Sequence, residues 1–238
     1  MMKVLYEDNH IIVVAKAAKE IVQGDKTGDT PLSEIVGAYI KSRYNKPGNV
    51  FVGVAHRLDR PVSGVVVFAR TSKALARLNA MLQSRQMEKR YFAIVKNIPP
   101  ETEGELVHYL VRNQIQNRSY AYDKEVKDSK LSRLRYRLIG SSINYHILEI
   151  ELLTGRHHQI RCQLSSIGCP IKGDLKYGAE RSNPDGSISL HAYRVAFEHP
   201  VSHNLIDIIA PLPEDALWRS FSTLLSPLLS RDCQLKPL

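Results

Sequence analysis

The first part of the chain alternates apolar runs with short polar turns. Residues 3–15 hold two β-branched runs on either side of a polar turn, which predicts a hairpin. Thr30 precedes Pro31, and this pair is typical of a helix start because Thr can cap free N–H groups and Pro fits the first helical position. The pattern therefore predicts a helix over residues 31–43.

Two further apolar runs, residues 50–55 and 64–69, have the composition of core strands. The segment between them, residues 56–63, is charged and contains a proline. We therefore expect this segment to be a loop held on a rigid base of two strands.

A second helix is predicted after Thr71, which can cap its first turn. Leu75, Leu78 and Leu82 recur at helical spacing and form the expected buried stripe. The chain returns to a strand at residues 91–95.

The pattern weakens over residues 99–140 and becomes clear again at residues 145–153, which predict a strand. A helix from about His157 follows, with Gly168 as its natural end.

The last third contains turns, two strands near residues 193–197 and 205–209, and apolar positions typical of a terminal helix. Strands outnumber helices and do not alternate strictly with them, so we predict an α+β fold with a largely antiparallel sheet. We expect a single domain over residues 1–238, in which residues 211–238 form a helical extension.

Charge narrows the choice of partner. The chain has 33 Lys and Arg against 24 acidic residues, a formal net charge of +9. Such an excess suits a polyanion such as nucleic acid, although a solubilising surface charge explains the composition equally well.

Basic and aromatic residues are interleaved in the weakly patterned region. They could follow an RNA backbone and stack on bases, but an edge hairpin with a solvated face explains any single one slightly better. The residues are Arg118, Lys124, Lys127, Lys130, Arg133, Arg135 and Arg137, with Tyr120, Tyr122 and Tyr136 among them.

The three cysteines, an odd number without close spacing, imply no disulfide framework, which fits a reducing compartment. The apolar runs are too short to span a bilayer, and no signal-peptide pattern occurs. We therefore expect a cytoplasmic protein with no membrane partner.

Asp59 is the first candidate for chemistry. It lies between Arg57 and Arg60, whose positive charges favour the ionised carboxylate. A carboxylate held this way can act as nucleophile or base. From the charge pattern alone, a structural Asp paired with an Arg is the better interpretation.

The surrounding motifs change that balance. The segment 56–59, His-Arg-Leu-Asp, resembles the catalytic motif of the RluA family of RNA pseudouridine synthases. Residues 153–161 are similar to the strand-to-helix motif of that family, and Lys-Arg-Tyr at 89–91 matches the place of its active-site tyrosine. The opening at residues 5–16 is also similar, and the resemblance covers about residues 3–210.

The resemblance implies the pseudouridine synthase fold and a reaction in which the glycosidic bond of a uridine breaks and the uracil rotates and rejoins the ribose through carbon 5. It implies three catalytic residues: Asp59, Arg161 as the cation paired with it, and Tyr91 as a stacking or proton-handling group. The implied substrate-binding residues, with Arg57 filling the gap left by the flipped base, are His56, Arg57, Arg60, Arg156 and Gln159.

The same resemblance implies ribosomal or transfer RNA as partner, recognised at a structured stem-loop, and neither cofactor nor metal, because no redox step or hydrolysis occurs. We expect a monomer consisting of the catalytic domain alone, without the N-terminal S4-type RNA-binding domain that relatives often carry.

Two positions depart from the family pattern. Residues 17–19 read Ala-Ala-Lys where the family usually has Pro, a small residue and Gly. Val62 stands where Thr is common, so one hydroxyl near the site is absent. Neither change affects a residue that carries the expected chemistry.

His157, His158 and Cys162 suggest a metal site, since i and i+4 positions share a helix face. No further pair of ligands stands at a convincing spacing, so we expect no zinc here.

Two other functions fit parts of the sequence. A catalytically silent RNA-binding protein of the same fold would have no need of Asp59, Tyr91 and Arg161. A glycosidase would need paired carboxylates, whereas only Asp59 lies in a recognisable motif and the basic surplus does not suit neutral sugars.

Overall fold

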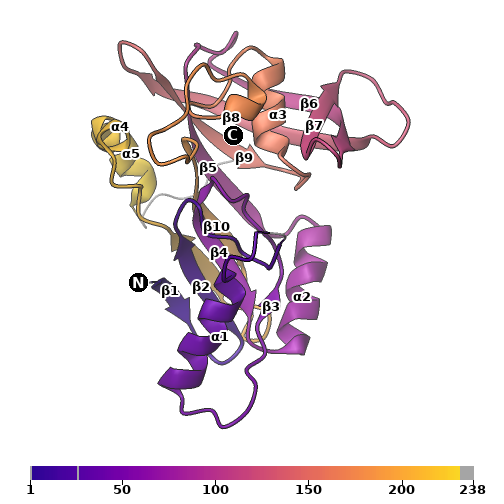
Figure 1. The fold of residues 1–238 in the computed structure, drawn as a ribbon, viewed down its shortest axis with the longest axis vertical. Helices are drawn as coiled ribbons and strands as arrows, with labels where there is room; N and C mark the ends of the chain where they lie inside the picture. Colours follow the sequence, from indigo (N-terminus) through magenta and orange to yellow (C-terminus); the bar gives the residue numbers. More distant parts are fainter. Residues whose placement is uncertain (1, 26, 231–238) are drawn as a thin grey trace. The chain divides into compact units, whose positions relative to one another are not determined.

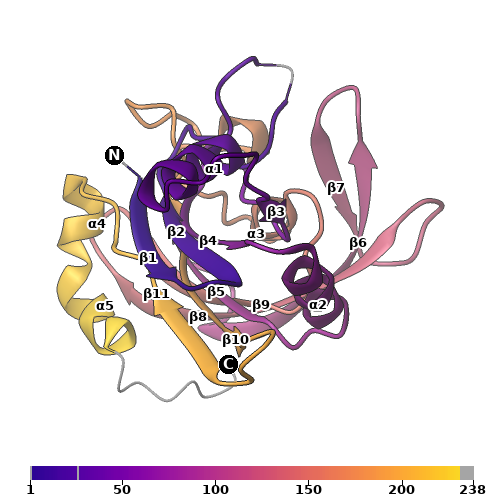
Figure 2. The ribbon, with the colours of Figure 1, turned by 90° about the horizontal axis from the view of Figure 1, so that it is seen from below.

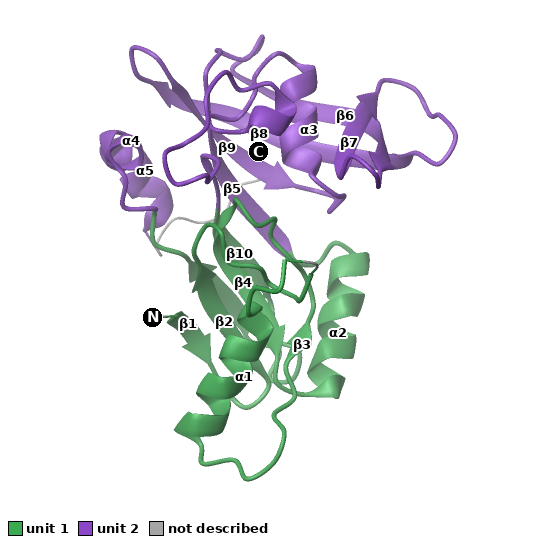
Figure 3. Cartoon of the chain, viewed as in Figure 1, with its two compact units in different colours: residues 1–87, 192–212 green, residues 88–191, 213–238 purple. Residues whose placement is uncertain are grey.

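The computed structural model describes residues 2–25 and 27–230, shown as a ribbon in Figure 1. The chain divides into two compact units, coloured separately in Figure 3. Unit 1 comprises residues 1–87 and 192–212, and unit 2 comprises residues 88–191 and 213–238. The expectation of a single domain over residues 1–238 stays a prediction.

Unit 1 is an antiparallel sheet with two helices. β1 pairs with β2, β2 with β4, β3 with the end of β4, and β10 with β11. The elements are β1 (Lys3–Glu7), β2 (Ile11–Lys16), α1 (Leu32–Arg43), β3 (Gly53–Val54), β4 (Ser63–Ala69), α2 (Ser72–Gln83), most of β10 (Leu190–Glu198) and β11 (Leu205–Ile209).

The predicted hairpin is confirmed as β1 and β2, and the Asp8 side chain shapes its turn by accepting hydrogen bonds from the backbone N–H groups of His10 and Ile11. The core of unit 1 is built from strands that are apolar along their whole length. Residues 11–14 of β2 and 65–69 of β4 are all buried. A strand buried on both faces needs this continuous apolar run rather than alternation.

The first helix is confirmed, but the predicted cap at Thr30 is wrong. Pro31 occupies the N-cap position, and no side chain caps the helix. The backbone N–H groups of Leu32 and Ser33 donate instead to the carbonyls of Ile21 and Val22. Backbone carbonyls of a neighbouring loop therefore cap this helix in place of a side-chain hydroxyl. At α2 the prediction is confirmed, since Thr71 Oγ1 accepts from the N–H of Ala74.

The strand predicted over residues 50–55 is mostly wrong. Only Gly53 and Val54 pair with β4, and Phe51 is 46% exposed. A β-prone run forms a strand only where a partner strand lies beside it.

The strands of unit 2 pair antiparallel in the order β5-β9-β8-β6-β7, and Figure 2 shows its hairpins from another side. Residues 99–140, where the pattern was weak, form three of its strands. The elements are β5 (Glu88–Val95), β6 (Glu103–Asn113), β7 (Arg118–Tyr122), β8 (Lys130–Ser141), β9 (His146–Leu152), α3 (Gln159–Ser166), the 3-10 turn η1 (Leu175–Tyr177), α4 (Ala216–Ser220) and α5 (Ser222–Leu229).

The helix predicted from His157 begins two residues later, because His158 has the left-handed backbone conformation with φ 52°. It ends as predicted near Gly168, whose φ is 77°. The single terminal helix is replaced by α4 and α5, which meet at Phe221. Residues 231–238 of the predicted helical extension lie outside the described residues.

The α+β class with a largely antiparallel sheet is confirmed. In the described part of the chain, no helix has the length and apolar character needed to cross a membrane.

Gly64 permits a close approach within unit 1. Its φ is 129°, and a Cβ at this position would lie 2.3 Å from the carbonyl oxygen of Ala192. We predict that Gly64→Ala lowers the free energy of unfolding by about 3 kcal/mol or more, because backbone strain and a backbone clash combine. Urea denaturation measures this loss. Gly48→Ala, with nothing within 4 Å of the added Cβ, is the control, and equal stability of the two variants would contradict the clash.

Candidate active site

The Asp59 loop joins β3 to β4 and is tied to unit 1 on both sides of the carboxylate. Before it, His56 Nε2 accepts from the backbone N–H of Val67 at 3.0 Å. After it, the Arg60 carbonyl accepts from the backbone N–H of Lys19 at 2.8 Å. Leu58 is 8% exposed and anchors the loop in the core. The neighbouring Asp59 is half-buried.

Lys16, at the end of β2, binds the backbone of the same loop. Its ammonium Nζ donates to the carbonyls of Asp59 at 3.3 Å, Arg60 at 3.2 Å and Val62 at 2.5 Å. The side chain is buried, and burial lowers the pKa of Lys16 to about 8, against the opposing effect of the Glu20 and Asp59 charges. Sequence reasoning missed this role, although a lysine that ends an apolar strand is a signal for it.

The two arginines that flank Asp59 differ in their surroundings. Arg60 is exposed and forms an ion pair with Asp29 at 2.5 Å. Arg57 is also exposed. The charge that the sequence assigns to the Asp59 loop is therefore shared in part with a carboxylate elsewhere in unit 1.

In unit 2, the segment before α3 folds into a tight polar turn. Gln159 Oε1 accepts from Thr154 Oγ1 at 2.8 Å and from the N–H of Arg156 at 3.0 Å. Gln159 Nε2 donates to the carbonyl of Arg133 on β8 at 3.0 Å, and Arg156 Nε donates to the carbonyl of Leu131. These contacts give Gln159 and Arg156 a structural role, and their RNA-binding roles stay predictions.

Arg161 lies in the first turn of α3 and is held by a partner that sequence reasoning missed. Its Nε and Nη2 donate to the two carboxylate oxygens of Asp174 at 2.6 and 2.8 Å. The guanidinium carbon lies 5.1 Å from the ring centroid of Tyr177. Arg161 and Asp174 are both buried. This bidentate geometry fixes the plane of the guanidinium.

Tyr177 connects this pair to β7. Its hydroxyl accepts from the N–H of Ser119 at 2.7 Å and lies 3.0 Å from Nδ1 of His158. Burial raises the pKa of Tyr177 to about 12, so the phenol keeps its proton. No local pattern links these residues, since they come from a strand, a turn and η1.

Tyr91 lies on β5 opposite Ile150 of β9 and is 6% exposed. Asp59 belongs to unit 1, whereas Tyr91 and Arg161 belong to unit 2. The predicted pairing of Asp59 with Arg161 and the action of Tyr91 on the same uracil therefore stay predictions.

The suspected metal ligands are engaged with protein groups. The ring of His157 stacks on that of His158 with centroids 3.7 Å apart, and Cys162 Sγ donates to the carbonyl of Ser119. Burial raises the pKa of Cys162 to about 11, which disfavours the thiolate that a metal requires. Within the described ranges, no group of three or more His, Cys, Asp or Glu side chains is arranged to hold a metal ion.

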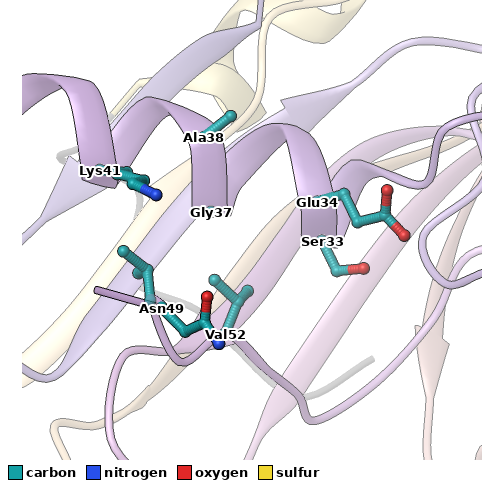
Figure 4. Close-up of a pocket in the computed structure, with 8 residues that line it drawn as sticks. Ser33, Glu34, Gly37, Ala38, Lys41, Asn49 and Val52 are labelled. Atoms are coloured by element: carbon teal, nitrogen blue, oxygen red, sulfur yellow. The ribbon is translucent and has the colours of Figure 1, made fainter. Parts of the chain in front are cut away.

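A hollow of about 340 Å³ lies elsewhere in unit 1, along α1 (Figure 4). Ser33, Glu34, Gly37 and Lys41 of α1 line one side of it, and Asn49 and Val52 line the other. None of the residues that the sequence singled out for chemistry faces this hollow. It is therefore separate from the candidate site.

Comparison with known proteins agrees with the motifs. The profile of the family described as RNA pseudouridylate synthase matches residues 10–166. An uncharacterized RNA pseudouridine synthase of Chloroflexus aurantiacus is 40% identical over 169 residues, 71% of this chain and 52% of that protein. Ribosomal large subunit pseudouridine synthase D of Xylella fastidiosa is 33% identical over 228 residues, 90% of this chain and 67% of that protein.

The chain thus spans about half of the length of the first relative and about two thirds of the second. The solved structure of human RNA Pseudouridylate Synthase Domain Containing 4 has a TM-score of 0.76, with 20% identity, over 94% of this chain and 93% of that one. At that identity the likeness shows the fold. Taken with the motifs at Asp59, Tyr91 and Arg161, these matches show that the chain belongs to the RluA family of RNA pseudouridine synthases.

Proposed function

We propose that this chain converts a uridine of ribosomal or transfer RNA to pseudouridine, with the Asp59 carboxylate as the catalytic group. The N1–C1′ bond breaks, the detached uracil rotates, a C5–C1′ bond forms, and the proton of C5 is lost as N1 gains one. The observation that carries the proposal is the Asp59 loop itself, which is tied to the core on both sides of a half-buried carboxylate. Large-subunit ribosomal RNA is the substrate to test first, because a relative carries that RNA in its name.

Arg161 and Tyr91 complete the proposed catalytic set. Asp174 occupies two N–H donors of Arg161 and thereby fixes the plane in which the guanidinium can meet a second carboxylate, that of Asp59. Tyr91 presents an aromatic ring for the uracil and a hydroxyl for the proton at carbon 5. The low exposure of Tyr91 suits a step from which bulk water is excluded.

The proposed RNA contacts differ in how directly they can act. Arg57 and Arg60 have exposed side chains, so their guanidinium groups can reach phosphates or fill the gap left by a flipped base. His56, Arg156 and Gln159 make hydrogen bonds inside their own loops. We propose that these three contribute mainly by shaping the loops that meet the RNA.

The first test replaces the carboxylate. Asp59→Asn should abolish turnover while RNA affinity stays within about tenfold, roughly 1.4 kcal/mol, since the amide keeps the size of the side chain. Tritium release from RNA labelled at carbon 5 of uridine measures turnover, and filter binding measures affinity. Asp25→Asn, which removes the same charge from an exposed position of unit 1, is the matched control. Pseudouridine formation by purified Asp59→Asn would refute the mechanism, and an inactive wild type that binds RNA would favour the silent binder.

A second test concerns the hydroxyl of Tyr91. Tyr91→Phe should lower kcat by more than it raises the RNA dissociation constant, because a proton-handling group acts only in the transition state. Single-turnover kinetics at saturating enzyme separate the two quantities. Equal losses in rate and affinity would indicate stacking alone, and unchanged kinetics would show that the hydroxyl has no role.

A third test removes the ammonium that holds the loop. Lys16→Met should lower the free energy of unfolding by about 1–3 kcal/mol, because the Val62 carbonyl loses its buried hydrogen bond to the ammonium. Turnover of the folded variant should fall as the Asp59 loop loses its fixed position. Chemical denaturation and the tritium assay measure the two effects, with Lys3→Met at an exposed position of β1 as control. Full turnover in Lys16→Met would mean that the loop keeps its place without this residue.

A further inference from the structure

One face of the strands β6, β7 and β8 in unit 2 carries a cluster of aromatic and apolar side chains. Tyr109 is paired in register with Tyr122 on one side and Leu131 on the other, and Val111 is paired with Tyr120. Directly opposite residues of antiparallel strands point to the same face of a sheet, as do residues two apart. We call this set the tyrosine face, and it consists of Val107, Tyr109, Val111, Tyr120, Tyr122 and Leu131.

The opposite face of the same strands is covered by α3. Gln163 Nε2 donates to the carbonyls of Leu106 and Ser132, and Leu110 packs in a cluster with Cys162 and Tyr177. The tyrosine face is therefore not needed to close the core of unit 2.

The tyrosine face is open to solvent to an unusual degree for its composition. Val107 is 47% exposed, Tyr122 43% and Leu131 37%, and the other three members are half-buried. Contiguous exposed aromatic and apolar side chains mark a surface that binds something. The charged side chains at the edge of the tyrosine face indicate which kind of ligand it binds.

On the β8 side, three arginines already pair with carboxylates. Arg133 and Arg135 pair with Glu105 at 2.5 and 3.2 Å, and Arg137 pairs with Glu149 at 2.6 Å. These arginines, which the sequence interleaves with the tyrosines, are therefore poor candidates for phosphate contacts. Tyr136, the third tyrosine of that sequence pattern, is buried.

Arg118, at the start of β7, has different surroundings. Its guanidinium carbon lies 5.3 Å from the ring centroid of Tyr120 and 5.1 Å from that of Tyr177. Among the described residues it makes no ion pair with a carboxylate, and its buried Nε has no hydrogen-bond partner. The following loop carries lysines and carboxylates in nearly equal number, whereas Arg118 lies against Tyr120 of the tyrosine face with no carboxylate partner among the described residues.

We propose that the tyrosine face and Arg118 together bind unpaired RNA nucleotides, with bases stacked on Tyr120 and Tyr122 and a phosphate at Arg118. Aromatic rings stack on any base, and a guanidinium beside them neutralises the backbone, which is how single strands are bound without sequence readout. The site would take a single-stranded segment flanking the target uridine. This inference rests on the proposed function in that it takes RNA as the substrate.

The experiment uses a fluorescent twelve-nucleotide oligoadenylate RNA, which contains no uridine and so gives the catalytic residues nothing to isomerise. Fluorescence anisotropy with the full chain should show affinity falling about tenfold for Tyr122→Ala, and further for the Tyr120→Ala, Tyr122→Ala double variant. Tyr122→Phe should bind like wild type because the ring remains. Arg118→Gln should reduce the slope of log affinity against log salt by about 0.7, the value for one phosphate contact on a single strand.

Phe51→Ala is the matched control, since it removes an exposed aromatic ring from unit 1. Unchanged affinity in both alanine variants would overturn the proposal, as would an equal loss in Tyr122→Phe. Sedimentation that shows a wild-type dimer and monomeric alanine variants would also overturn it, because the face would then be a contact between two copies of the chain. If an alanine variant does not fold, the salt dependence of Arg118→Gln decides. A reduced slope supports the proposal, and an unchanged slope overturns it.

The outcomes for the catalytic proposal are separate. Asp59→Asn should bind the oligoadenylate like wild type. Turnover by Asp59→Asn would refute the proposed mechanism without affecting the proposal for the tyrosine face. Intact binding by the tyrosine variants would refute the proposal for the tyrosine face without affecting the mechanism.

Discussion

The hold of one buried ammonium on the Asp59 loop is the constraint on which unit 1 depends. Lys16 contacts the carbonyls of Asp59, Arg60 and Val62, and its burial is nearly complete. A buried charge without partners would be costly, and buried carbonyls without donors would be costly as well. Each therefore satisfies the other, and the loop adopts one position although it contains no regular structure. The departure of residues 17–19 from the family pattern leaves this arrangement intact, since the Lys19 N–H also donates to Arg60.

In unit 2, buried charges are stabilised by ion pairs. Glu149 on β9 is fully buried, and Arg90 and Arg137 on the two neighbouring strands each donate to one of its oxygens. A shift of either strand by one residue would remove one of the two partners of that carboxylate, so the pairs also define the register. Arg161 and Asp174 repeat the arrangement beside α3. The basic residues of the chain are thus divided into those that pair with carboxylates within the fold and those that do not.

That division changes how the net charge of +9 is interpreted. Composition alone suggests a broadly cationic surface, whereas several strand arginines of unit 2 lie beside carboxylates. Under the proposed function, affinity for RNA would then depend on local groups such as Arg57 and Arg118 and on aromatic stacking. Selectivity for one uridine would then come from the shape of the RNA that these groups meet.

The sequence by itself determined the antiparallel α+β class, the hairpin at residues 3–15, the loop around Asp59 and the family, because local periodicity and contiguous motifs are written in neighbouring residues. Only the tertiary structure decided that carbonyls of a neighbouring loop cap α1, that β3 is two residues long and that the backbone of His158 is left-handed. Each of these features depends on a partner far away in the chain. The same holds for the contacts of Lys16 with the Asp59 loop and for the pairing of Asp174 with Arg161. It also holds for the difference between Arg118, which has no carboxylate partner among the described residues, and the arginines of β8, which have one. Burial and ion pairing are properties of three-dimensional neighbours, and the spacing of residues along one chain does not encode them.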